Sequence, residues 1–139
     1  MQRRHILVID DEPQVASLYE RYIQEQGYQV IGHYDPSSAK ERAKQVKPFA
    51  IILDIMMPGI DGWQVLSELK SNEDTSGIPV IICSIVEDEE KGFELGATDY
   101  LIKPVMEEDL LKSLDRLAIE ESIDEVLVID DNSRHLERN

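Results

Sequence analysis

Short apolar runs alternate along the chain with segments whose apolar residues recur at helical spacing. The runs predict five strands, at residues 5–10, 28–34, 49–53, 79–83 and 99–102. The first run is compact and ends in acids, without the alternation of a half-exposed strand. Such a run is typical of a strand that is buried on both faces of a sheet.

The segments between the runs predict five helices. Pro13 suits a first helical turn and Gly27 the position after the last turn, while Asp35 and Asp61 suit the caps of the helices that follow them. The predicted helices extend from Pro13 to a cap at Gly27, from Pro36 to about Val46, from Gly62 past Leu69, over residues 87–95, and from beyond Pro104 to about residue 120. Strands that alternate with helices predict an α/β fold, with right-handed crossovers and a parallel sheet that has helices on both faces.

Residues 1–120 contain no linker-like or low-complexity segment and are predicted to form one domain. Beyond them, Leu127–Asp131 repeats Leu7–Asp11 residue for residue. A short apolar string followed by acids can recur by chance, but we favour a true repeat. We interpret residues 121–139 as a linker and the first-strand remnant of a second, similar domain, so that the chain would be a fragment of a longer protein.

Charge and cysteine content restrict the partners and the compartment. The 139 residues carry a net charge of −15, which disfavours binding to nucleic acid or to an anionic membrane surface. No apolar stretch approaches the ~18 residues of a membrane span, and the apolar run near the start is too short for a signal peptide. The single cysteine, Cys83, is predicted to be a core thiol in a reducing compartment. We therefore predict a cytoplasmic protein without membrane insertion.

Polar side chains stand where the predicted strands end. Asp10 and Asp11 end the first strand, Asp54 follows the third, Ser84 the fourth and Lys103 the fifth. Taken singly, each is more often a turn, cap or surface residue. Because ligands of open parallel sheets bind at the carboxyl ends of the strands, we expect these five residues to converge there.

Three carboxylates at close range cannot all stay ionised without a proton or a cation. Mg²⁺ prefers such hard oxygen ligands and leaves room for phosphate oxygens. One carboxylate would then be free to attack phosphorus and form an acyl phosphate. The hydroxyl of Ser84 and the ammonium of Lys103 would balance charge on the transferring group. The residues therefore predict Mg²⁺-dependent phosphoryl transfer.

Four blocks, in this order, resemble the receiver domain of two-component response regulators: LVIDDEP, IILDIMMPGIDGW, VIICS and LGATDYLIKP. The resemblance covers residues 5 to about 118. It implies a flavodoxin-like (βα)5 fold, in which a doubly wound sheet has five parallel strands in the order 2-1-3-4-5. It also implies that Asp54 accepts a phosphoryl group from a histidine kinase or a histidine phosphotransfer protein.

The resemblance further implies a ligand set for Mg²⁺. Asp11 would ligate the ion directly, Asp10 largely through bound water, and Met56 through its backbone carbonyl, beside Asp54.

The resemblance implies a switch as well. Ser84 and Lys103 would contact the phosphoryl oxygens, and the Lys103-Pro104 peptide would be cis. On phosphorylation Ser84 would move toward the phosphoryl group and Tyr100 would turn inward, although Tyr100 could equally be a half-buried strand aromatic. The fourth helix, fifth strand and fifth helix would form the output face, through which a homodimer could form.

Two features depart from the family pattern. Ile85 stands where the family often has a small residue beside the phosphoryl pocket, which would restrict access. The stretch from Ser84 to Lys103 is a few residues short, which would shorten the fourth helix and alter the signalling surface.

Two other classes of function compete with this interpretation. A Mg²⁺-dependent phosphohydrolase would also use Asp54 as nucleophile, but it needs a general acid, commonly an Asp two positions on, where this chain has Met56. A pseudo-receiver that only binds proteins would not need the complete set of acids, hydroxyl and lysine. We therefore predict a signalling domain that catalyses only its own phosphorylation and dephosphorylation. Its effector domain would lie elsewhere in a multidomain sensor kinase or regulator.

Overall fold

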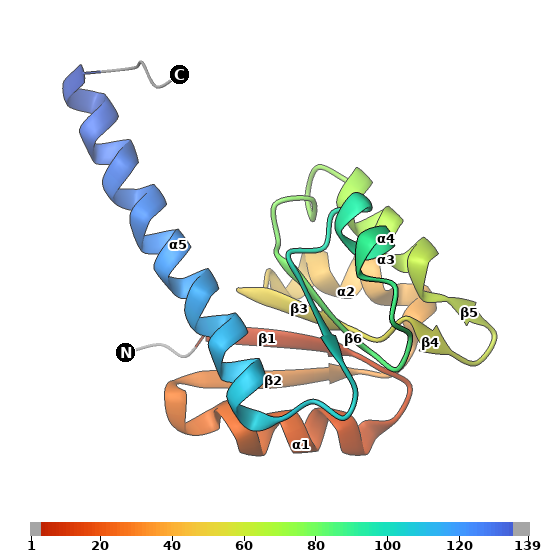
Figure 1. The fold of residues 1–139 in the computed structure, drawn as a ribbon. Helices are drawn as coiled ribbons and strands as arrows, with labels where there is room; N and C mark the ends of the chain where they lie inside the picture. The colour runs from red at the N-terminus through yellow and green to blue at the C-terminus, as the bar shows by residue number, and fades with distance from the viewer. Residues whose placement is uncertain (1–3, 135–139) are drawn as a thin grey trace.

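A five-stranded parallel sheet lies at the centre of the computed structural model, which describes residues 4–134, with the backbone alone described for 124–134 (Figure 1). The strands are β1 (Arg4–Ile9), β2 (Tyr28–His33), β3 (Ala50–Leu53), β6 (Val80–Ser84) and β7 (Asp99–Ile102). Their order in the sheet is β2-β1-β3-β6-β7. These are the five predicted strands in the predicted order 2-1-3-4-5, so the flavodoxin-like fold is confirmed.

The register of the sheet aligns the carboxyl ends of its strands. Ile9 at the end of β1 lies opposite Leu53 at the end of β3. The pairing continues one residue further, because the backbone N–H of Asp54 donates to the carbonyl of Ile9 at 3.0 Å. On the other side, the N–H of Lys103 donates to the carbonyl of Ser84 at 2.9 Å. The residues that follow the strands are thereby held at one edge of the sheet.

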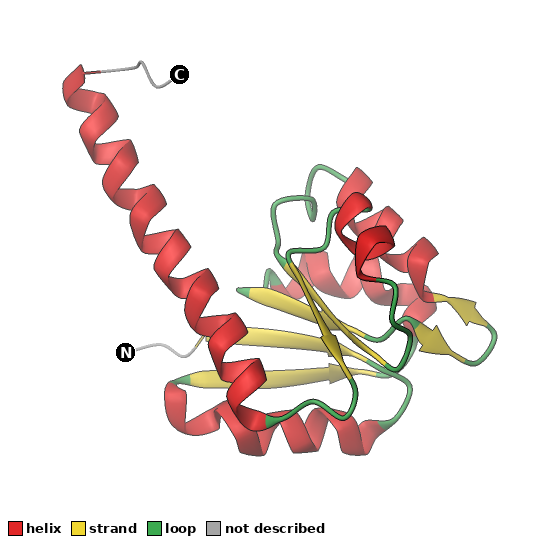
Figure 2. Ribbon diagram, viewed as in Figure 1, coloured by secondary structure: helices red, strands yellow, loops and turns green. Residues whose placement is uncertain are grey.

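Helices cover both faces of the sheet (Figure 2). On one face α1 (Pro13–Ile23) and α5 (Glu107–Arg134) bury apolar residues such as Ile23 and Leu110 against the strands. On the other lie α2 (Ala39–Val46), α3 (Gly62–Ser71) and the short α4 (Glu89–Glu94). Because both faces are covered, the central strands are apolar throughout.

The predicted boundaries of the first four helices hold with small changes, whereas α5 runs past the predicted end near residue 120. A 3-10 turn, η1 (Gln24–Gln26), extends α1 to Gly27, whose φ is 93°. A second 3-10 turn, η2 (Pro36–Ser38), precedes α2, and Asp35 caps it by accepting the N–H of Ser37. The carboxylate of Asp61 caps α3 by accepting the N–H of Trp63 at 3.0 Å.

A small antiparallel hairpin, absent from the prediction, follows β3. Its strands are β4 (Met56–Met57) and β5 (Ile60–Asp61). At the end of the hairpin, the chain packs closely against Ile55. A Cβ atom at Gly62 would lie 2.4 Å from the Cα of Ile55, so only glycine fits there. The hairpin therefore fixes the chain directly after Asp54.

The carboxyl-terminal segment corrects the prediction. The strand expected at Leu127–Asp131 is part of α5, a helix of 28 residues that projects from the domain (Figure 1). At Leu7–Asp11 the same five residues run from the end of β1, which is held between two neighbouring strands, into the turn after it. At Leu127–Asp131 they continue a helix that satisfies its own backbone hydrogen bonds. The assignment of residues 121–139 to a linker and a second domain stays a prediction, and 135–139 lie outside the described residues. No helix within 4–134, α5 included, is long and apolar enough to cross a membrane.

Candidate functional site

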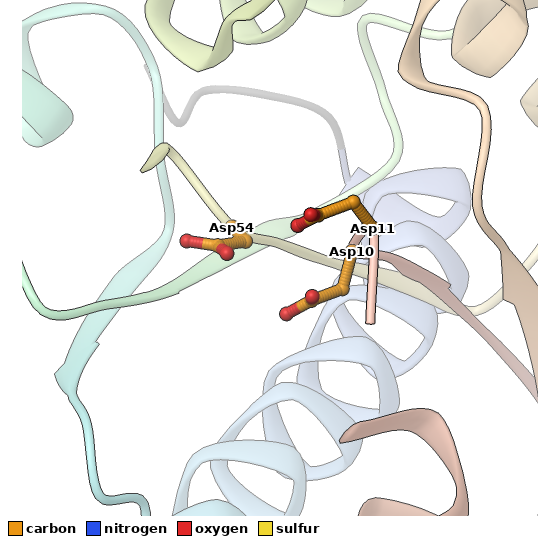
Figure 3. Close-up of side chains that lie close together, drawn as sticks. All are labelled: Asp10, Asp11 and Asp54. Atoms are coloured by element: carbon orange, nitrogen blue, oxygen red, sulfur yellow. The ribbon is translucent and has the colours of Figure 1, made fainter. Parts of the chain in front are cut away.

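Three carboxylates meet at the carboxyl edge of the sheet. Asp10 and Asp11 lie in the turn between β1 and α1, and Asp54 directly follows β3. One carboxylate oxygen from each lies within 4.8 Å of the others (Figure 3). Asp10 and Asp54 are buried, with 3% and 6% of their surface exposed, while Asp11 is half-buried. The structure therefore brings together the three acids that the sequence analysis singled out.

The ammonium of Lys103 joins two of these acids. Its Nζ atom lies 3.0 Å from Oδ2 of Asp10 and 3.4 Å from Oδ2 of Asp54. The second oxygen of each acid is held by the backbone: Oδ1 of Asp10 accepts the N–H of Glu12 at 3.0 Å, and Oδ1 of Asp54 accepts that of Met56 at 3.1 Å. Both carboxylates are thus oriented by one backbone donor and one ammonium.

Burial and neighbouring charges shift the pKa values of Asp54 and Lys103. Burial is the main cause of a raised pKa at Asp54; the charge of Asp10 adds to it and Lys103 partly opposes it. Burial alone would lower the pKa of Lys103, but its hydrogen bonds and charge interactions with Asp10 and Asp54 outweigh burial and raise it. Three carboxylates facing one ammonium leave an excess of negative charge. This set of hard oxygen donors fits Mg²⁺, which would remove that excess.

A cavity of about 310 Å³ opens over the acids. Asp54 and Lys103 line it, and Met56 and Ile85 contribute exposed apolar side chains, 56% and 65% of whose surface is accessible. The expected restriction of access by Ile85 stays a prediction. The cavity is large enough to take a phosphoryl group.

Ser84 and Tyr100 are linked through the backbone of one residue, Val86. Ser84 is fully buried at the end of β6, and its Oγ accepts the N–H of Val86 at 3.2 Å. The hydroxyl of Tyr100 donates to the carbonyl of Val86 at 2.5 Å and accepts the N–H of Asp88 at 3.4 Å. Tyr100 is buried, with 7% of its surface exposed, so it lies inside the fold rather than half-buried.

The sequence analysis missed the two backbone hydrogen bonds of Val86, because every residue has the same backbone groups and the residue type does not reveal their partners. It also missed the hairpin beside Asp54, for which Pro58-Gly59, a typical turn pair, was the available sign. The cis peptide expected at Lys103-Pro104 is present. The six residues of α4 agree with the shortened fourth helix.

Residues 6–115 match the family described as "Response regulator receiver domain". The chain belongs to this family. It is 38% identical over 112 residues to Protein PilH of Pseudomonas aeruginosa, an alignment that covers 78% of this chain and 93% of that protein. It is 39% identical over 110 residues to the "Probable transcriptional regulator ycf27" of Porphyridium aerugineum, covering 79% of this chain and 46% of that protein.

Solved structures show the same fold. The chemotaxis protein CheY4 of Vibrio cholerae superimposes with a TM-score of 0.74 at 25% identity, covering 83% of this chain and 98% of that one. The receiver domain of a signal transduction histidine kinase from Syntrophus aciditrophicus has a TM-score of 0.73 at 31% identity, covering 82% and 89%. The chain spans about half the length of some curated relatives, 46% for the ycf27 regulator and 45% for RpaA of Synechocystis, and nearly all of PilH.

This family assignment defines the class of function. A receiver domain is the phosphoacceptor signalling domain of a two-component system, a signalling module that binds Mg²⁺ at an acidic pocket. Response regulators interact with histidine kinases or phosphotransfer proteins and with effector domains.

Proposed function

We propose that Asp54 is the phosphoacceptor of this receiver domain. The observation that carries the proposal is the position of its carboxylate, in the lining of the cavity and 3.4 Å from the ammonium of Lys103. A carboxylate oxygen of Asp54 attacks the phosphorus of a phosphohistidine, the P–N bond breaks, and the imidazole leaves with the electron pair. The donor is a histidine kinase or a histidine phosphotransfer protein.

We assign the metal site to Asp10, Asp11, Asp54 and the backbone carbonyl of Met56. Bound there, Mg²⁺ supplies neutralisation of charge on the phosphoryl oxygens. We also propose that the Lys103 ammonium pairs with a phosphoryl oxygen, which its pairing with two carboxylates of the site supports.

We also propose that Ser84 contacts the phosphoryl group and that Ser84 and Tyr100 form the switch. Their shared bonds to Val86 support this, because a displacement of Ser84 would be felt at Tyr100. The output face would comprise α4, β7 and α5, with a homodimer as one arrangement.

We further propose that the effector domain lies elsewhere in the parent protein and that the protein works in the cytoplasm. In this proposal the domain turns over no substrate other than the phosphodonor.

Incubation with a small phosphodonor, such as acetyl phosphate, and Mg²⁺ tests the acceptor assignment. Intact-mass spectrometry should show one added phosphoryl group, which disappears in Asp54→Asn and in the presence of a chelator. Asp74→Asn, which removes the same charge at an exposed site, should be labelled like the wild type. Equal labelling of Asp54→Asn would disprove the assignment. Catalytic hydrolysis of a generic phosphomonoester would favour a phosphohydrolase, and failure of every form to label would favour a pseudo-receiver.

A further inference from the structure

The ring of Tyr100 lies against a glycine of α4. Gly92 is buried in this helix, and a Cβ atom added to it would lie 2.7 Å from Cδ2 of Tyr100 and 3.0 Å from Cδ1 of Ile82. Real Cβ atoms do not approach a ring atom so closely, so any larger residue at position 92 must displace the ring. The space that the ring occupies exists because residue 92 has no side chain.

The helix cannot easily move away to make room. The N–H of Gly92 donates to the carbonyl of Asp88 at 3.2 Å, and the carbonyl of Gly92 accepts the N–H of Ala97 at 2.9 Å. These bonds fix residue 92 within the α4 segment, and the N–H of Thr98, just beyond it, donates to the carbonyl of Val80 in β6 at 2.8 Å and ties the segment to the sheet. An added methyl group would therefore be accommodated by movement of Tyr100.

A glycine inside a helix of six residues has a cost. Glycine is a poor helix former, and alanine at the same position would favour the helix. Helix propensity thus disfavours glycine at position 92, whereas the packing of Tyr100 requires glycine there. The conflict indicates that the packing of the ring decides the residue at this position.

Displacement of the ring would reach the phosphoryl site through Val86. The carbonyl of Val86 would lose the hydroxyl of Tyr100, and the same residue's N–H is the group that Ser84 Oγ accepts. Without the bond from the Tyr100 hydroxyl, the backbone of Val86 is less well fixed, and its bond to Ser84 Oγ is weakened. The hydroxyl of Ser84 would then be less well oriented.

We propose that Gly92 is a positioning residue for the phosphoacceptor site. It leaves open the space for the Tyr100 ring, the hydroxyl on that ring holds the carbonyl of Val86, and the N–H of Val86 orients Ser84. This inference rests on the proposed function for the contact between Ser84 and the phosphoryl group.

The test compares Gly92→Ala with Gly77→Ala, a glycine at which an added Cβ meets nothing within 4 Å. Phosphorylation of Gly92→Ala by acetyl phosphate at saturating Mg²⁺ should be slower by about tenfold, the factor that corresponds to one lost orienting hydrogen bond. Its Kd for Mg²⁺ should stay unchanged, because the three acids are untouched. Amide hydrogen exchange at Val86 and Asp88 should accelerate, and Gly77→Ala should match the wild type in all three measurements.

A second background separates positioning from folding. In Tyr100→Leu the ring is gone, so adding Gly92→Ala should cause no further slowing of phosphorylation and should not accelerate exchange at Val86. Slowing by the same factor in both backgrounds, or wild-type rate and exchange in Gly92→Ala, would overturn the proposal. If the wild type accepts no phosphoryl group at all, the proposed function fails, and the chemical part of this inference with it. Exchange at Val86 and Asp88 then still decides whether Gly92 holds the ring in place.

Discussion

Lys103 and Asp10 are 93 positions apart in the chain, yet the Nζ atom of one lies 3.0 Å from Oδ2 of the other. The contact joins the end of β7 to the end of β1 across the two strands between them. Because the same ammonium also reaches Asp54, one cation is shared by two buried carboxylates. Among the described residues, Lys103 is thus the cation that pairs with these two carboxylates.

Removing one of the crowded charges should stabilise the protein when no metal is bound. We expect Asp54→Asn to raise the free energy of unfolding in a chelator by about 1–2 kcal/mol, since it relieves repulsion between acids in a poorly solvated site. Urea denaturation with and without Mg²⁺ measures the effect, and the added stability from Mg²⁺ should be smaller than in the wild type. The exposed control Asp74→Asn should change stability by less than about 0.5 kcal/mol. A loss of stability in Asp54→Asn would contradict the view that its charge is unfavourable.

Removing the lysine should have the opposite effect. Lys103→Met leaves Asp10 and Asp54 without their ammonium, and we expect a loss of about 1–3 kcal/mol of unfolding free energy in a chelator. Mg²⁺ should restore part of this loss, because it supplies positive charge to the same oxygens. Lys112→Met, at an exposed position of α5, serves as the control. Denaturation curves that coincide for Lys103→Met and the control would show that the pairing has no net effect.

The affinity for Mg²⁺ should depend on Asp11. Asp11→Asn removes a carboxylate charge from the site, and we expect Kd for Mg²⁺ to rise about tenfold or more, since losing even an indirect partner of a metal ligand costs that much. Trp63, the single tryptophan, lies with Met56 in an adjoining cavity and provides a fluorescence signal for the titration. Unaltered affinity in Asp11→Asn would remove this residue from the ligand set.

A second polar cluster joins the proposed output elements. Oδ2 of Asp99 accepts bonds from Ser113 Oγ at 2.7 Å and from the guanidinium of Arg116 at 2.8 Å, so β7 is tied to α5. We expect Asp99→Ala to lower the free energy of unfolding by about 1–3 kcal/mol, because the buried hydroxyl of Ser113 loses its partner. Thermal or urea denaturation provides the measurement. Asp115→Ala, an exposed acid on the same helix, should have little effect, and equal losses in the two variants would rule out the cluster as the cause.

The carboxyl-terminal helix shows how far a local pattern can mislead. Leu7–Asp11 and Leu127–Asp131 have the same letters, but the first runs from β1 into the turn after it and the second lies within α5. β1 has a strand on each side to complete its hydrogen bonds, and a strand cannot be stable without such partners. The repeat predicted a strand because a short sequence does not show whether neighbouring strands are present to pair with it.

The order of amino acids was enough to predict three features. These are the strands, from their apolar runs, the polar residues at the strand ends, and the residues that cap the helices. Strands buried on both faces must be apolar throughout, and Asp35 and Asp61 cap by contacts within two residues along the chain. The same local logic placed Asp10, Asp11, Asp54, Ser84 and Lys103 at one edge of the sheet. Only the tertiary structure decided which atoms meet there, how Val86 links Ser84 to Tyr100, and why residue 92 must lack a side chain. The contact between Lys103 and Asp10 spans 93 positions of the chain, and that between Tyr100 and Val86 spans 14. The distances in all these contacts depend on how whole strands and helices pack against one another.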